Sequence, residues 1–456
     1  MVELEPRAFS APGKALLIGG YLVLNPQYKA FVLALSARMH AVVKASSRSD
    51  ISGVYLNVKS SQFNNNQWNY KVSRDNGYVP LEINDLTNPF VEQVVFNAFN
   101  YFAPENLKFN YIEIEIFSDP AYHSSEGSKR KVNQFKSFNF HEKDIDEVNK
   151  TGLGSSAGLV TVLTTALCYV LMNGNSLDIS NPNHLKMIHN LAQVAHCQAQ
   201  GKIGSGFDVA AATYGSIIYQ RFEPAIIADL PVMDIKDINK YHVALKTLID
   251  NLDWNITCEP VKLPPRLKVI MGDVHSGSKT VKLVSTVQKW YAENLPRSHE
   301  IYEEINFNNT VAVNTLIKLY HISEERPDYY NKMIDGLNND KNDDPDIKVL
   351  AESIEMIREL FRTITQESGA AIEPLEQTEL LNACLGLRGV IGGVVPGAGG
   401  HDAISLVMTE ETNIKKITAG NPSFKNVTWM DVTQEQVGLK EENAEYYKDL
   451  ESDEDR

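Results

Sequence analysis

A glycine- and serine-rich segment, Gly152–Ala157, runs directly into an apolar stretch that ends near Met172. This order predicts a flexible loop that leads into the first turn of a buried helix. Backbone N–H groups at such a helix start point outward and attract phosphate. The letters GLGSSA match neither the P-loop pattern nor the GxGxxG dinucleotide pattern, and alone they are equally typical of a serine-capped turn.

Two more glycine-rich segments occur far from the first one. Ala11–Lys14 lies near the start of the chain, and Pro396–Ala403 lies near its end between two strand-like runs. Lys14 supplies a positive charge that suits a phosphate or a reacting oxygen, although a solvated lysine is the simpler alternative. Pro396–Ala403 also fits a plain β-turn, but ligand contacts concentrate in loops at strand ends. Three such loops in one chain favour a phosphate-binding site over three ordinary turns.

A carboxylate, Asp208, stands between glycines and a run of small apolar residues that should be buried. A lone carboxylate in such a place is costly unless it is paired, and a lysine partner would keep it ionised. In phosphoryl transfer an acid of this kind orients the acceptor or takes its proton. The structural alternative is a buried salt bridge.

Composition restricts the partners of the chain. The 456 residues carry a formal net charge of −15, which disfavours binding to nucleic acid. Four widely spaced cysteines without a CxxC pair fit a reducing compartment. The N-terminus lacks the pattern of a secretory signal, and the most apolar stretch, 157–172, is shorter than the ~20 residues of a membrane span. We therefore expect a cytoplasmic protein, a monomer or weak dimer, with no membrane and no nucleic-acid partner.

Apolar periodicity predicts a mixture of strands and helices. Alternation over 30–45 and 109–117 is typical of strands, and helical patterns cover 158–171 and 184–200. The second half is expected to add strands at 267–274, 388–395 and 403–408, and helices at 278–293, 299–322, 347–367 and 376–387. This mixture indicates the α+β class.

We expect two domains, 1–233 and 234–440, because a proline-bearing acidic stretch near Asp234 resembles a crossover. Residues 124–150 mix serine, asparagine and both charge signs, which predicts a surface insertion within the first domain. Residues 441–456 are dominated by acids and lack an apolar face, which predicts a disordered tail.

Four segments, in order along the chain, resemble the successive motifs of the GHMP kinase family, named for its galactokinase, homoserine kinase, mevalonate kinase and phosphomevalonate kinase members. They are APGKALLIGGYLVL at 11–24, KTGLGSSAGLVTVLTTA at 150–166, GSGFDVAAATYGS at 204–216 and PGAGGHDAI at 396–404. The stretches AHCQAQGKIGSGFDVAAATYGSI, GSKTVKLV and ESGAAIEPLEQTELL are most similar to the fungal-type phosphomevalonate kinase branch.

The resemblance implies a two-domain GHMP kinase fold, with an N-terminal mixed α/β domain and a C-terminal ferredoxin-like α+β domain. It also implies an enzyme that uses ATP and Mg²⁺ to phosphorylate a small molecule, 5-phosphomevalonate. The loop Gly152-Leu153-Gly154-Ser155-Ser156-Ala157 would bind the triphosphate, with Ser155 or Ser156 near Mg²⁺. Lys14 and Asp208 would flank the reacting oxygen. Because the implied acceptor is already anionic, no strong base is needed, and the resemblance favours an orienting or electrostatic role for Asp208 over that of a general base.

The anionic acceptor needs positive charges and donors in the resembling segments. The candidates are Lys14, Lys202, Ser205, Ser278, Thr280 and Gly399. The turn 277–280 precedes a helical pattern, so its N–H groups either face an anion or serve helix capping alone.

One departure from the family concerns the metal. Many members carry a Mg²⁺-binding glutamate in the helix before the aspartate, whereas His196-Cys197-Gln198-Ala199-Gln200 contains no carboxylate. Gln198, Gln200 or a water molecule would take that place. Another kinase of the family, such as mevalonate kinase, and a non-catalytic nucleotide sensor of the same fold are the alternatives, and the presence of both Lys14 and Asp208 disfavours the sensor.

Overall fold

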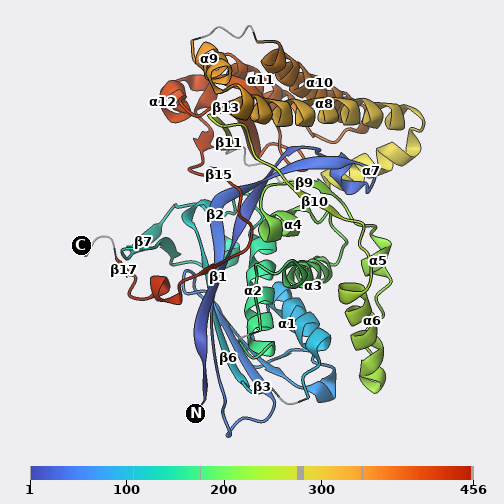
Figure 1. The fold of residues 1–456 in the computed structure, drawn as a ribbon, viewed down its shortest axis with the longest axis vertical. Coiled ribbons are helices and arrows are strands. Elements are labelled where there is room, and N and C mark those ends of the chain that lie inside the picture. The colour runs from blue at the N-terminus through green and yellow to red at the C-terminus, as the bar shows by residue number, and fades with distance from the viewer. Residues whose placement is uncertain (1, 106, 175, 275–281, 340–343, 453–456) are drawn as a thin grey trace.

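The chain folds into two units that meet along one long pair of strands (Figure 1). The structure is a computed structural model and describes residues 2–105, 107–174, 176–274, 282–339 and 344–452. Strands and helices occur together in both units, so the predicted α+β class and two-domain architecture are confirmed.

The N-terminal unit is built on a large mixed sheet. Its strands are β1 (Glu3–Ile18), β2 (Lys29–Ser46), β3 (Val54–Lys59), β4 (Gln67–Val72), β5 (Leu81–Glu82), β6 (Tyr111–Ser118), β9 (Ile217–Gln220), β10 (Thr257–Pro260), β15 (Gln434–Glu435) and β16 (Lys440–Glu442). The order β10-β9-β2-β6-β3-β4-β5 forms the main path, and β1 pairs with β2 along nearly its whole length. All of these pairs are antiparallel except β3 with β6.

Helices cover one face of this sheet. They are α1 (Pro89–Phe102), α2 (Ser155–Leu171), α3 (Pro182–Gln200), α4 (Phe207–Tyr214), α5 (Ala225–Ala228) and α6 (Ile238–Asp250). The central helix α2 packs on β1 and β2, and α1 and α3 pack on α2 (Figure 1). Val160, Leu163 and Leu167 lie with Phe9 and Ile112 in one buried core, so α2 is held rigidly from its first turns.

The segment Ala11–Lys14 is not the loop that we predicted from its glycine and proline. It lies inside β1, where the pairing with β2 shifts register between Pro12 and Gly13. A bulge of this kind accepts proline and glycine within a strand and changes the direction of the next side chain. Lys14 is that next side chain.

The C-terminal unit contains a four-stranded antiparallel sheet in the order β12-β13-β11-β14. Its strands are β11 (Leu267–Val274), β12 (Val390–Val394), β13 (Ala403–Thr409) and β14 (Val427–Trp429). Its helices are α7 (Leu283–Glu293), α8 (Arg297–Glu325), α9 (Pro327–Leu337), α10 (Pro345–Ser368), α11 (Leu375–Leu385) and α12 (Ile414–Thr418). Val269 and Val407 face the core with α8 to α10, whereas Ile270 and Leu406 face the core with α11.

The boundary between the units lies further along the chain than the expected 233/234. Tyr241, Leu245 and Leu248 of α6 belong to the N-terminal core, so this unit continues through β10, which pairs with β9. The proline-bearing stretch near Asp234 is therefore a surface connection inside the first unit.

The expected disordered tail is instead folded through Ser452. The chain returns from the C-terminal unit along β1, as the red segment in Figure 1 shows, and β16 pairs with Ala8–Ser10. A short 3-10 helix, Ala444–Tyr447, buries Tyr447 against Phe138. The acidic composition did not indicate these contacts, because they depend on partners far away in sequence: Glu442 accepts from Ser10, and Tyr446 and Tyr447 pack on Phe135 and Phe138.

Residues 124–150 form a surface hairpin with a buried side. Strand β7 (Ser128–Val132) pairs with β8 (Ser137–His141), and β17 (Glu451–Ser452) adds to β7. Phe138 of β8 is fully buried. The insertion and the end of the chain thus hold each other on the N-terminal unit.

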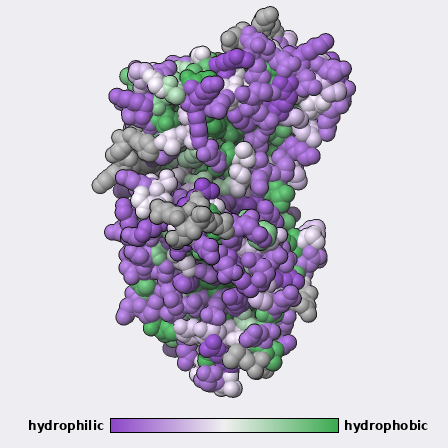
Figure 2. All heavy atoms as spheres, turned by 90° about the vertical axis from the view of Figure 1, so that its left-hand side faces the viewer, coloured by the Kyte–Doolittle hydropathy of each residue, from purple (hydrophilic) through white to green (hydrophobic). Residues whose placement is uncertain are grey.

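The exterior fits the acidic, polar composition. Figure 2 shows a face dominated by hydrophilic side chains, with apolar ones in small scattered areas. Among the described residues, no helix combines the length and the apolar character needed to cross a bilayer.

Candidate active site

The phosphate loop, defined here as Gly152–Ala157, ends in the first turn of α2. Gly154 is the N-cap residue and has φ of +84°, a conformation that glycine adopts without strain. The first-turn N–H groups of α2 have no partner within the helix, and the helix dipole adds positive potential at this end. Ser155 and Ser156 are half-buried at this helix start. The local geometry therefore suits an anion.

Lys14 is fixed against this loop by two hydrogen bonds. Its backbone N–H donates to the carbonyl of Leu153 at 3.0 Å, and its Nζ donates to the carbonyl of Gly152 at 2.8 Å. A strand of the sheet thus carries the cation directly to the loop.

Asp208 lies in the first turn of α4, on the other side of Lys14. A Cβ atom placed on Gly154 would lie 3.2 Å from Cε of Lys14 and 3.9 Å from Cβ of Asp208, so the three residues meet at one point. The Asp208 carboxylate accepts from the backbone N–H of Val209 at 3.0 Å. Burial lowers the pKa of Lys14, and the negative charge of Asp208 acts against that fall. Among the ion pairs of the described residues, Lys14 and Asp208 form no direct salt bridge.

His196 belongs to this cluster, and the sequence analysis missed it. Its Nε2 lies 3.0 Å from Oγ of Ser156, 3.2 Å from Nε2 of Gln200 and 4.0 Å from Oδ2 of Asp208. The ring is almost fully buried on α3. In sequence, 196–200 differs from the family pattern by its lack of a carboxylate, which does not point to the imidazole. The available signal was the spacing of His196 and Gln200, which places both on one face of the helix.

The two glutamines considered as substitutes for a glutamate lie in different surroundings. Gln198 accepts from Asn97 at 2.6 Å and donates to Tyr241 at 2.9 Å, so its amide is committed to the contact with α1 and α6. Gln200 contacts His196 and remains beside the site.

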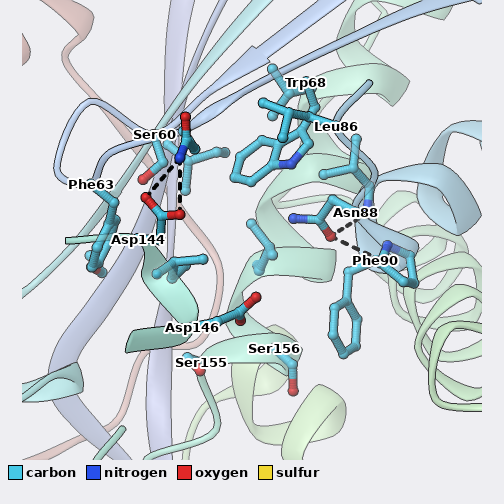
Figure 3. A pocket seen from close by; sticks show the side chains of 18 of the residues that line it. Ser60, Phe63, Trp68, Leu86, Asn88, Phe90, Asp144, Asp146, Ser155 and Ser156 are labelled. Atoms are coloured by element: carbon cyan, nitrogen blue, oxygen red, sulfur yellow. Dashed lines mark hydrogen bonds between the residues drawn. The ribbon is translucent and has the colours of Figure 1, made fainter. Parts of the chain in front are cut away.

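A cavity of about 290 Å³ adjoins the phosphate loop. Figure 3 shows Phe63, Trp68 and Phe90 around it, with Ser155 and Ser156 at one end. The remaining labelled residues include Leu86 and Asn88 above the loop, and Asp144 and Asp146 beside it. The lining comes from separate strands, the two helices α1 and α2, and the insertion, so no local pattern in the sequence could have indicated it.

Two buried side chains bind the backbone of the segment before Asp208. Ser205 accepts a hydrogen bond at its carbonyl from the Tyr219 hydroxyl at 2.8 Å. The buried guanidinium of Arg221 donates to the carbonyls of Ile203 and Gly204 at 3.0 and 2.6 Å. Lys202 is exposed at the rim of the same segment.

The second glycine loop, defined here as Pro396–Gly400, connects β12 to β13 and carries Gly399. Gly400 donates from its backbone N–H to the carbonyl of Ile372 at 3.0 Å. Gly399 has φ of +80°, and a Cβ there would lie 2.4 Å from the same carbonyl oxygen. Ser278 and Thr280, the other candidates from this half, lie outside the described residues.

Comparison with known proteins identifies the class. A family model described as "GHMP kinases N terminal domain" matches residues 125–216. Phosphomevalonate kinase of Candida albicans is 42% identical over 450 residues, covering 97% of this chain and 99% of the relative. The chain therefore belongs to the GHMP kinase family.

A second relative and one solved structure carry the same description as the Candida albicans protein. Phosphomevalonate kinase of Gibberella zeae is 35% identical, covering 90% of this chain and 89% of the relative. Among solved structures, Streptococcus pneumoniae phosphomevalonate kinase in complex with phosphomevalonate and AMPPNP superposes with a TM-score of 0.60. That alignment covers 95% of this chain and 100% of the other at 15% identity, which shows the fold alone.

Proposed function

We propose that this chain is a phosphomevalonate kinase, which transfers the γ-phosphoryl group of ATP to 5-phosphomevalonate and releases ADP and 5-diphosphomevalonate. The meeting of Lys14, Gly154 and Asp208 at the start of α2 is the observation that supports it most directly. This arrangement places a cation and a carboxylate next to an anion-binding helix end, which is what phosphoryl transfer to an anionic acceptor requires. The full-length similarity to fungal relatives supports the choice of acceptor.

The nucleotide would occupy the phosphate loop and the adjoining cavity. The N–H groups of Leu153 to Ala157 would bind the β- and γ-phosphates, and Lys14 would face the transferred group. The cavity beside Ser155 has the size and apolar lining of a site for a flat ring system, so we place the base between Trp68 and Phe90.

The donor set near the loop fits Mg²⁺. Hydroxyl oxygens of Ser155 and Ser156 lie at the loop, and Mg²⁺ commonly uses few protein ligands together with phosphate oxygens and water. Ser155 and Ser156 would hold it, with His196 fixing the Ser156 hydroxyl at 3.0 Å. When bound, Mg²⁺ offsets the charge of the triphosphate.

Asp208 would act mainly by orientation and charge. The attacking oxygen belongs to a phosphate that is already largely ionised near neutral pH, so no strong base is needed. The Asp208 carboxylate lies beside Lys14 without forming an ion pair with it, and this leaves both side chains available to the reactants. Lys202, Ser205 and Gly399 are proposed acceptor contacts, together with Ser278 and Thr280.

Several finer properties follow from the same proposal. The reaction belongs to the mevalonate route to isoprenoids and sterols, and we place it in the cytoplasm. The acceptor and nucleotide are the expected partners of a monomer or weak dimer, with no nucleic-acid or membrane partner.

A substrate panel tests this function. The purified chain is incubated with Mg-ATP and, separately, mevalonate, phosphomevalonate, galactose or homoserine, and ADP release is measured. We expect turnover with phosphomevalonate alone. Turnover of mevalonate alone would assign the chain to another kinase of the family, and saturable ATP binding without any turnover would indicate the non-catalytic sensor.

A further inference from the structure

We propose that Tyr21 is a positioning residue that fixes the second glycine loop relative to Lys14. Tyr21 follows β1 and lies within the junction of the two units, 4% exposed. Its hydroxyl donates to the carbonyl of Ala398 at 2.6 Å. This inference rests on the proposed function only in assigning Gly399 to the acceptor.

The backbone of Tyr21 is unusual for a residue with a side chain. Its φ of +59° and ψ of −48° lie in a region that residues other than glycine rarely adopt. Such a conformation persists where the surroundings determine it strongly, and it is frequent at functional sites. Here it directs the phenol away from the end of β1 and toward the C-terminal unit.

Packing against the C-terminal unit fixes the direction of the Tyr21 phenol. The ring meets Phe361 of α10 edge-on, with centroids 6.2 Å apart. The preceding residue, Gly20, also faces this side, because a Cβ there would lie 3.3 Å from Phe361 and 3.5 Å from the carbonyl of Gly397. Burial raises the pKa of Tyr21, so the hydroxyl keeps its proton and remains a donor.

The second glycine loop is therefore held from two sides. Ile372 of the C-terminal unit accepts from Gly400, and Tyr21 of the N-terminal unit donates to Ala398. Lys14 and Tyr21 lie on one continuous segment that starts in β1. The Tyr21 hydroxyl thus fixes the second glycine loop, and with it Gly399, to the segment that carries Lys14.

Tyr28 offers a matched control. It is equally buried, and its hydroxyl also bridges the units by donating to Glu303 of α8 at 2.6 Å. This bond does not involve the second glycine loop. Tyr21→Phe and Tyr28→Phe each remove one part-buried hydroxyl hydrogen bond between the units and keep the ring.

Two measurements on the full chain test the proposal. Hydrogen exchange of the peptide that contains Gly399 and Gly400 reports loop order without any substrate. We expect Tyr21→Phe to accelerate this exchange about threefold to tenfold, as the loss of one hydrogen bond predicts. Steady-state kinetics should show a rise of similar size in KM for phosphomevalonate, with KM for ATP unchanged.

The result expected for the control variant differs from the results that would contradict the proposal. Tyr28→Phe should leave both the loop exchange and the KM for phosphomevalonate at the unmodified values, with a thermal midpoint close to that of Tyr21→Phe. Unchanged exchange in Tyr21→Phe, or an equal effect of the two substitutions, would overturn the positioning role. If the unmodified chain does not turn over phosphomevalonate, the proposed function fails and the exchange comparison alone decides the role of Tyr21.

Discussion

The phosphate loop and the second glycine loop are both glycine-rich, but the structure fixes them in different ways. The phosphate loop is continuous with α2, whose residues are almost all buried, and it is tied to Lys14 on the neighbouring strand. The second glycine loop connects two strands and is held by Ile372 and Tyr21, which are distant from it in sequence. One loop is fixed by its own helix, and the other depends on the meeting of two units.

This difference suggests a division of labour. The rigid loop with Lys14 and Asp208 suits the chemical step, where small displacements cost large factors in rate. The second glycine loop lies at the junction between the units and suits a role in acceptor binding. Substitutions near the phosphate loop should therefore act on kcat, and substitutions in the second glycine loop should act on KM for the acceptor.

The largest expected effect tests the first half of this division. Asp208→Asn removes the carboxylate beside Lys14 and should lower kcat by about 10²–10³-fold, as the loss of a preorganised charge does elsewhere. ATP affinity, measured by equilibrium binding, should change little because the phosphate loop is retained. An equal loss of kcat and ATP affinity, together with a lower thermal midpoint, would indicate that Asp208 has only a structural role.

The same contrast explains what could be predicted from sequence. The phosphate loop and α2 are local features, since glycines, serines and an apolar run follow one another, and the expected helix 158–171 is observed as Ser155–Leu171. The strand predicted at 267–274 has those bounds. The resemblance to a family predicted that Lys14 and Asp208 lie close together, and the structure places both next to Gly154.

Features created by long-range contacts could not be predicted in this way. The bond from Tyr21 to Ala398 joins residues that are far apart in the chain, and the cavity beside the phosphate loop brings together Trp68 and Phe90 from separate elements. His196 was visible in sequence, but only the packing of α3 beside α2 brings it to Ser156. The C-terminal segment was misjudged because its composition suggested solvent, whereas its backbone pairs with β1.

A second prediction, with a smaller expected effect, tests the role of the second glycine loop in acceptor binding. Gly399→Ala would place Cβ 2.4 Å from the Ile372 carbonyl oxygen, so the second glycine loop must shift. We expect KM for phosphomevalonate to rise about tenfold, roughly the effect of one displaced hydrogen-bonded contact, with KM for ATP unchanged. Gly397→Ala is the matched control, because its φ of +68° causes similar backbone strain while its Cβ would meet nothing within 4 Å. Equal KM values for the two variants would show that loop strain, not loop position, controls acceptor binding.

The smallest effect concerns the electrostatic coupling on the phosphate-loop side. Burial lowers the pKa of Lys14 from 10.5, and the charge of Asp208 opposes that change. As pH rises through the lowered pKa, Lys14 loses the positive charge that we propose faces the phosphoryl group, so kcat/KM should fall at a lower pH than an ordinary lysine would give. Asp208→Asn removes the opposing charge, so the pKa of Lys14 should then fall further. NMR titration of ¹³C-methylated lysines measures this change.

Lys268 is the internal control, because burial also lowers its pKa while Glu410 and Glu411 oppose the change. Asp208→Asn should leave the pKa of Lys268 unchanged. A Lys14 pKa that does not respond to Asp208→Asn would mean that the two residues act independently, and the contrast between the two loops would then rest on geometry alone.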